Sequence, residues 1–126
     1  METSILTSTK KILGIEGDYT VFDLDIITHI NTVFSTLTQL GIGPKEGFAI
    51  EDADAEWDDF IDIDNDPRFN AVKSYMFLKV KMLFDPPTTS YLIDSSNRQI
   101  IELEWRLNGF REETAWTNPF PPIIGE

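Results

Sequence analysis

The sequence predicts an all-α fold, a small bundle of about four helices with an acidic loop and an extended C-terminal arm. The strongest observation is the stretch 26–40, where apolar residues recur at intervals of three and four, as on the buried face of a helix. A second is a pair of helices predicted over 66–84 and 90–108, separated by Asp85-Pro86-Pro87. Because proline lacks an amide hydrogen and clashes with the preceding turn, two prolines in succession end one helix and force a corner.

Helix-start and helix-stop residues divide the front of the chain into two helices. Ser4 is a competent N-cap for a first helix that ends at Gly14, where glycine favours the left-handed conformation. Thr20 as a cap, followed by Asp23 near the positive helix end, predicts the start of the second helix, and Gly41 closes it. Its buried stripe consists of Ile26, Ile27, Ile30, Val33, Phe34, Leu37 and Leu40.

The middle of the chain is predicted to be mostly loop. Residues 42–47 form a turn-rich connection, and residues 48–50 are one short extended edge at most. Over 54–61 we expect a turn or two of helix that packs its apolar residues on the core while the acids face water. These apolar anchors are Trp57, Phe60 and Ile61.

The last two helices have different numbers of apolar sides. Asp66 as N-cap and Pro67 at the first helical position predict the start of the third helix, whose apolar face comprises Phe69, Val72, Tyr75, Met76, Val80, Leu83 and Phe84. The fourth has one stripe of Leu92, Ile93, Ile100, Leu103 and Leu107, and a second side of Ile101 and Trp105. A helix with two apolar sides needs two partners, and a second copy of the chain is a natural candidate for one of them.

The sequence changes character after Gly109. Three prolines between 119 and 122 prevent a continued helix, yet the segment is too apolar for a typical disordered linker. We therefore divide the chain into a helical domain, residues 1–109, and a C-terminal arm, residues 110–126. The residues predicted to form protein interfaces are Ile101, Trp105, Phe110, Trp116, Phe120, Ile123 and Ile124.

Composition limits the class of protein. A chain of 126 residues fits one domain, and the absence of cysteine excludes disulfides, thiolate metal sites and a cysteine nucleophile, as expected in a reducing cytosol. No segment is long and apolar enough to cross a membrane, and the N-terminus lacks the basic start of a signal peptide. We expect a soluble protein with no membrane partner.

The negative charge is concentrated in one place. The net charge is -12, and residues 51–66 hold nine acids and no base. Because affinity for nucleic acid comes mainly from Lys and Arg, such a surface repels phosphates. Acids at alternate positions also resemble a calcium loop, but Trp57 stands where that loop needs glycine and Ile63 where it needs a bidentate Glu. We expect no metal site and a solvated acidic loop that includes Asp52, Asp54, Asp58, Asp59, Asp62 and Asp64.

Catalytic chemistry is poorly supplied. His29, the single histidine, follows Asp25 by one helical turn, a spacing that can orient an imidazole for base catalysis. No activated nucleophile, phosphate loop, dinucleotide fingerprint or zinc spacing accompanies it. Glu102 and Glu104 point to different sides of their helix, and Glu102 with Arg106 has the i, i+4 spacing of a surface ion pair. We predict no catalytic residue, no cofactor and no enzyme activity.

The amino-acid sequence of the predicted helix pair resembles that of one protein family. Residues 72–87 read VKSYMFLKVKMLFDPP, residues 97–100 read NRQI, and residues 102–108 read ELEWRLN. With shorter matches between residues 5 and 43, these segments resemble the head-tail connector (adaptor) proteins of tailed phages with long non-contractile tails. The resemblance covers about residues 5–108 and not the arm.

The resemblance implies a virion protein of the head-tail neck, made in the host cytoplasm and attached to the portal protein. It implies a homo-oligomeric ring of about twelve copies that receives a stopper or tail-completion protein and extends the DNA channel. DNA passes through such a channel during ejection without specific binding, and an acidic surface suits that passage because like charges repel. Asp23, His29 and Asn31 lie in the segments that resemble the family, and the resemblance implies that they are fold or subunit-contact residues.

Two alternatives stay open at this point. An acidic inhibitor that mimics DNA would use the acids of residues 51–66 to imitate phosphates and bind a nucleic-acid enzyme. An enzyme built on His29 and Asp25 has the weaker support, since neither residue has a catalytic neighbour in the sequence.

Overall fold

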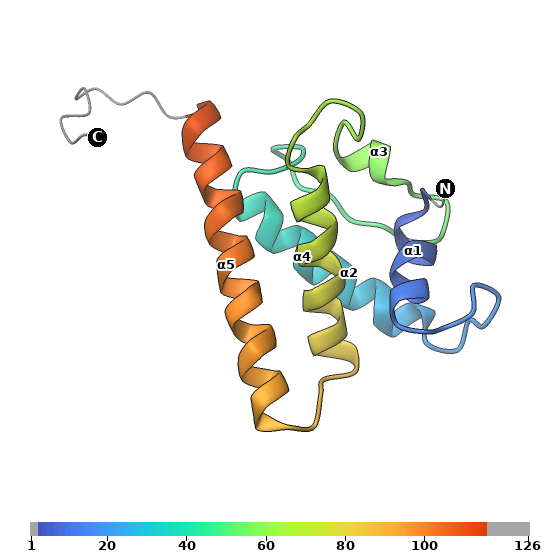
Figure 1. Ribbon diagram of the computed structural model, residues 1–126. Coiled ribbons are helices and arrows are strands. Elements are labelled where there is room, and N and C mark those ends of the chain that lie inside the picture. The colour runs from blue at the N-terminus through green and yellow to red at the C-terminus, as the bar shows by residue number, and fades with distance from the viewer. Residues whose placement is uncertain (1–2, 116–126) are drawn as a thin grey trace.

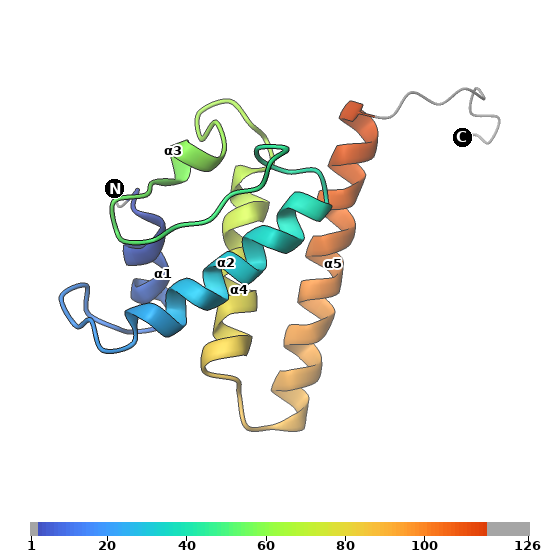
Figure 2. The same ribbon diagram turned by 180° about the vertical axis from the view of Figure 1, so that it is seen from behind.

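The computed structural model describes the backbone of residues 3–115 and the side chains of residues 3–109. Over this range it contains five helices and no strand, so the prediction of an all-α bundle is confirmed. The helices are α1 (Ile5–Ile12), α2 (Asp23–Gln39), α3 (Trp57–Phe60), α4 (Phe69–Phe84) and α5 (Ser90–Ala115). Helices α4 and α5 lie side by side, α2 crosses α4, and α1 and α3 lie on the side away from α5 (Figures 1 and 2). Helix α4 is central because it contacts α1, α2 and α5.

Helix α1 begins and ends as the sequence predicts. The Ser4 hydroxyl accepts a hydrogen bond from the Thr7 amide at 3.2 Å, which caps the helix. Gly14 follows the helix with φ +80°, a left-handed conformation that glycine adopts without strain. The same Ser4 hydroxyl donates to the Ala53 carbonyl at 2.8 Å, and the Ile5 amide donates to the Ala55 carbonyl at 3.0 Å. The start of α1 is therefore attached to the segment that precedes α3.

Helix α2 begins three residues later than the predicted cap. The Thr20 carbonyl, not its side chain, accepts from the Asp23 amide, and Phe22 occupies the cap position without a side-chain hydrogen bond. The Thr20 cap was therefore the wrong prediction, because residues 20–22 form a turn before the helix. The predicted stripe is confirmed: Ile26, Ile30, Val33, Phe34 and Leu37 are buried, and Ile27 and Leu40 are half-buried against the core.

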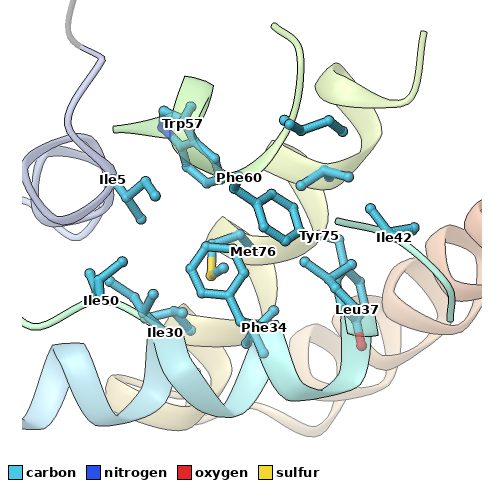
Figure 3. Packing of buried hydrophobic residues seen from close by; sticks show 14 of the residues in the cluster. Ile5, Ile30, Phe34, Leu37, Ile42, Ile50, Trp57, Phe60, Tyr75 and Met76 are labelled. Atoms are coloured by element: carbon cyan, nitrogen blue, oxygen red, sulfur yellow. The ribbon is translucent and has the colours of Figure 1, made fainter. Parts of the chain in front are cut away.

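The core is built around the aromatic rings of α2, α3 and the loop between them (Figure 3). The Phe34 ring lies 4.6 Å from Phe60 and 4.9 Å from Phe48, measured between ring centroids. As predicted, Trp57, Phe60 and Ile61 are buried while the neighbouring acids are exposed. Gly43 is required here, because its φ is +83° and a β-carbon would collide with the Phe60 ring.

Helix α4 begins at Phe69, two residues after the predicted first position, Pro67. The Asp66 carboxylate accepts from the Arg68 amide at 2.9 Å, so it stabilises a turn ahead of the helix instead of capping the helix itself. The predicted apolar face is largely confirmed, with Val72, Tyr75, Met76 and Val80 buried, Phe69 and Phe84 half-buried, and Leu83 exposed.

Helix α5 starts at the predicted Ser90 but continues to Ala115. The predicted end at Asn108 is wrong by about two turns. A glycine inside a helix costs only about 1 kcal/mol relative to alanine, and Arg111, Glu112 and Glu113 after it are good helix formers. The helix break therefore need not come before the prolines that start at Pro119. No helix within the described residues is long and apolar enough to span a membrane.

Candidate functional site

One face of α5 carries large apolar side chains that are mostly exposed in the described part of the subunit. We call Tyr91, Ile101 and Trp105 the outer α5 surface; they are 75 %, 64 % and 76 % exposed. Tyr91 and Trp105 are fourteen residues apart, four turns of helix, and Ile101 lies one turn before Trp105, so the three share one side of the helix. The exposure of Ile101 and Trp105 agrees with the predicted second side, and their contact with a partner stays a prediction.

The opposite face of α5 attaches the helix to α4. Ile100 and Leu107 are buried, and the Tyr75 hydroxyl of α4 donates a hydrogen bond to the Glu104 carboxylate at 2.7 Å. Burial, together with this hydrogen bond, raises the pKa of Tyr75 above its usual value. Lys79 lies 3.9 Å from the same carboxylate. The apolar and polar contacts together fix the position of the outer face.

A groove of about 530 Å³ runs beside the outer α5 surface, between the first turns of α4 and the second half of α5. Pro67 lies just ahead of α4 and Trp105 belongs to the outer surface, so the exposed indole forms part of the groove wall. The other lining residues are Asn70, Ala71, Ser74, Leu103, Arg106 and Gly109.

A second exposed apolar surface was missed by the sequence analysis. It lies where the α1–α2 connection enters α2, and we call Tyr19, Val21, Phe22 and Leu24 the Phe22 surface. The Phe22 ring packs on Phe84 of α4 at 5.4 Å and on Tyr19 at 5.9 Å. The signal available in the sequence was that these four residues are close together and fall outside the buried stripe of α2.

A buried lysine holds the Phe22 surface in place. Lys10 is only 1 % exposed, and its ammonium donates to the carbonyls of Gly17 at 3.0 Å and Tyr19 at 2.8 Å. The Asp23 carboxylate lies 2.7 Å away as its counter-ion, although the pair is not aligned as a hydrogen bond. Because removing any partner would leave a buried charge unpaired, this arrangement strongly favours one conformation of the connection.

Several residues within the segments that resemble the connector family have structural roles in this fold. Besides Asp23, the Asn31 side chain accepts from the Ile50 amide at 2.8 Å and donates to the Ile50 carbonyl at 3.0 Å. The Asn31 side chain thus provides hydrogen bonds to the backbone N–H and C=O of Ile50, which lies in an extended segment with no neighbouring strand in the described structure. The His29 ring faces Phe84, with centroids 6.5 Å apart, and within residues 3–109 no hydrogen bond joins it to Asp25. The geometry gives no support to a catalytic pair.

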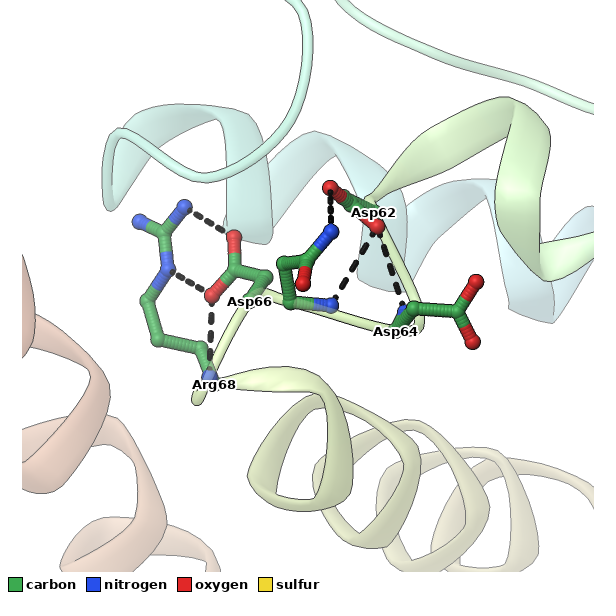
Figure 4. Close-up of polar contacts among 5 residues, drawn as sticks. Asp62, Asp64, Asp66 and Arg68 are labelled. Carbon is green, nitrogen blue, oxygen red and sulfur yellow. Dashed lines mark hydrogen bonds and ion pairs between the residues drawn. The ribbon is translucent and has the colours of Figure 1, made fainter.

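The acidic loop is solvated, and several of its carboxylates bind the local backbone. Asp62 accepts from the amides of Asp64 and Asn65 and from the Asn65 side chain at 3.0 Å (Figure 4). The Asn65 side-chain hydrogen bond is the main cause that lowers the pKa of Asp62. The carboxylates of Asp52 and Asp59 accept backbone amides in the same way, and Asp54, Asp58 and Asp64 are exposed.

At the end of the acidic loop, Asp66 forms a two-pronged ion pair with Arg68, at 2.9 and 2.7 Å (Figure 4). The hydrogen bonds from this guanidinium lower the pKa of Asp66. Among the described residues, no group of three or more acids or histidines is placed to hold a metal ion.

The structure thus places Ile101 and Trp105 one turn apart on α5, and Trp105 lines the same groove as Pro67, which directly follows the acidic loop. Phe110 lies within α5, but its side chain and residues Trp116, Phe120, Ile123 and Ile124 are outside the described part. A family model described as phage connector protein matches residues 5–114, from the start of α1 almost to the end of α5. Comparisons with curated proteins and with solved structures find no match.

Proposed function

Because the chain belongs to the phage connector protein family, we propose that it forms a ring in the virion neck between the portal protein and the stopper or tail-completion protein. In this position the ring extends the DNA channel and has a structural role, without catalysis or a cofactor. The protein is made in the host cytoplasm and is located in the virion neck. The observation that carries the proposal is the match over residues 5–114, which takes in both exposed apolar surfaces.

The surface chemistry supports assembly into a larger particle. A single subunit exposes Trp105, Leu24 and Tyr91 at about three-quarters of their area. Tryptophan and tyrosine in particular are typical anchors of protein interfaces. Large apolar side chains that are exposed to water raise the free energy of a free monomer, and covering them with a partner lowers it.

The charge supports passage of DNA without binding. The chain has a net charge of -12, and most acids of residues 51–66 are exposed. A carboxylate-rich wall repels phosphates, which lowers friction during ejection. We further propose that the C-terminal arm, residues 110–126, contacts the portal protein, with residues 110–115 continuing α5 and with Phe110, Trp116, Phe120, Ile123 and Ile124 as its apolar contacts.

The test is to purify virions of the phage that encodes the chain, identify their proteins by mass spectrometry and image the neck by cryo-electron microscopy. We expect the chain in stoichiometric amounts and five-helix subunits in a ring directly below the portal. Purified, infectious virions that lack the chain would contradict the proposal.

A variant of the same phage distinguishes the connector function from the DNA-mimic alternative. Asp58 and Asp64 are exposed and accept no hydrogen bond within the described residues, so Asp58→Asn with Asp64→Asn removes charge without removing local contacts. We expect normal infectivity from this double variant. A DNA mimic would instead lose its affinity for a nucleic-acid enzyme, which a pull-down from infected cells would show as a lost partner.

A further inference from the structure

The outer α5 surface and the Phe22 surface lie on opposite sides of the subunit. Helix α5 forms one edge of the molecule, and α1 with the α1–α2 connection forms the other (Figures 1 and 2). A ring of identical subunits needs two different surfaces on each subunit, because every contact joins one surface to another. Surfaces on opposite sides also give a small turn from each subunit to the next, which suits a ring of many members.

Both surfaces are apolar, and one cation of the outer α5 surface has candidate counter-ions on the Phe22 surface. The outer α5 surface also carries the exposed acids Asp94 and Glu102, of which Glu102 is paired with Arg106. Arg98 lies midway between Tyr91 and Trp105 on the same line of α5, is exposed, and has no ion-pair partner within residues 3–109. The Phe22 surface is flanked by three exposed acids, Glu16, Asp18 and Asp25, and one exposed base, Lys11. An arginine within an apolar patch therefore has acids available to it on the other surface.

We propose that the outer α5 surface of one subunit binds the Phe22 surface of a second copy of this chain. Trp105 and Ile101 pack on Phe22 and Leu24 of the neighbour, and Arg98 pairs with the acids beside them. This inference rests on the proposed ring and specifies which surfaces form it. Lys10 makes the contact possible, because it holds the Phe22 surface in one conformation before a neighbour arrives.

A contact between two outer α5 surfaces explains the observations less well. Such a two-fold contact would leave the Phe22 surface exposed. It would also end at a dimer, because both copies would have used the same surface.

The chain contains no cysteine, so introduced cysteines report only on the positions chosen. Val21 and Glu102 are exposed neighbours of Phe22 and Trp105 that leave both aromatic anchors unchanged. In virions that carry Val21→Cys with Glu102→Cys in one chain, a short bismaleimide is expected to link neighbours into a ladder of dimers, trimers and larger products on denaturing gels. Virions that carry a mixture of the two single variants should give dimers only.

The control is Val21→Cys with Ser35→Cys, because Ser35 is exposed on α2 and belongs to neither surface. It should give no ladder. A second pair, Thr20→Cys with Asp94→Cys, repeats the test at two other exposed positions beside the contact and leaves its named residues unchanged. If the chain is present in virions and neither pair gives a ladder, the inference is overturned and the connector function stands. If the chain is absent from virions, the proposed function fails first, and this inference fails with it.

Discussion

Ile100 and Ile101 are adjacent isoleucines on α5 with opposite environments. Ile100 is 7 % exposed and faces α4, whereas Ile101 is 64 % exposed and faces solvent. Burying an isoleucine side chain is worth about 1.5–3 kcal/mol, and Ile100 has nearly all of this benefit within the subunit. Among the described residues, Ile101 has little of this benefit. The comparison shows that one face of α5 stabilises the subunit while the other is exposed to solvent, and we propose that this second face serves assembly.

Two glutamates on α5 differ in the same way, one contacting α4 and the other exposed to solvent. Glu104 is half-buried and accepts a hydrogen bond from the buried Tyr75. Glu102 is exposed and pairs with Arg106 at 2.7 Å, one turn along α5. The inner carboxylate joins two helices, while the outer one contacts only its own helix.

The largest expected effect comes from truncating the two isoleucines in turn. Ile100→Ala should lower the free energy of unfolding by about 2–4 kcal/mol, because it leaves a cavity between α4 and α5. Ile101→Ala should change it by less than about 0.5 kcal/mol, since its side chain is already in water. Urea unfolding of the dilute full-length protein, followed by circular dichroism, measures both. Equal losses would show that Ile101 also contributes to the folded subunit.

Periodic patterns predicted the parts of the fold that depend on burial. The stripe of α2 and most of the inner stripe of α5 follow from which residues avoid water, although Leu92 of that inner stripe is 50 % exposed. The corner at Asp85-Pro86-Pro87 follows instead from proline, which cannot continue a helix. Helix boundaries were less predictable. Asp66 stabilises a turn ahead of α4 and Thr20 is not used as a cap, and in the structure neither α2 nor α4 has a side-chain cap hydrogen bond.

The candidate site was predictable only where it lies on a helix. Ile101 and Trp105 follow from their i, i+4 spacing. The Phe22 surface depends on Lys10, a residue type that a sequence pattern assigns to solvent but that here is buried and binds the carbonyls of Gly17 and Tyr19. Only the three-dimensional position of α1 reveals that contact.

A smaller effect on the free energy of unfolding is expected from removing the hydrogen bond between Tyr75 and Glu104. Tyr75→Phe keeps the buried ring and removes the hydrogen bond to Glu104, which should cost about 1–2 kcal/mol at neutral pH. Because the folded state raises the pKa of Tyr75, its stabilising contribution is complete below the unfolded value of about 10 and falls as the pH rises above it toward the folded value.

Urea unfolding of wild type and Tyr75→Phe at several pH values between 7 and 11 isolates this group, because the titration of lysines is common to both proteins. The difference in stability between the two should shrink or reverse above pH about 10. A difference that stays constant over this range would mean that the tyrosine hydroxyl titrates as it does in water, and that the inner face of α5 is less closed than Ile100 indicates.

The smallest effect is expected from the outer glutamate. Glu102→Gln removes an ion pair whose two side chains are more than half exposed, and such pairs contribute about 0.3–0.5 kcal/mol on a helix. We expect a loss of that size, which disappears in high salt because exposed charges are screened. Urea unfolding at low and high salt measures it. A loss above about 1 kcal/mol would indicate that the outer face contributes to the subunit's own stability. If the variant is stable and head-tail joining is nevertheless impaired, Glu102 acts through Arg106, which also lines the groove, by holding the guanidinium in position for a partner.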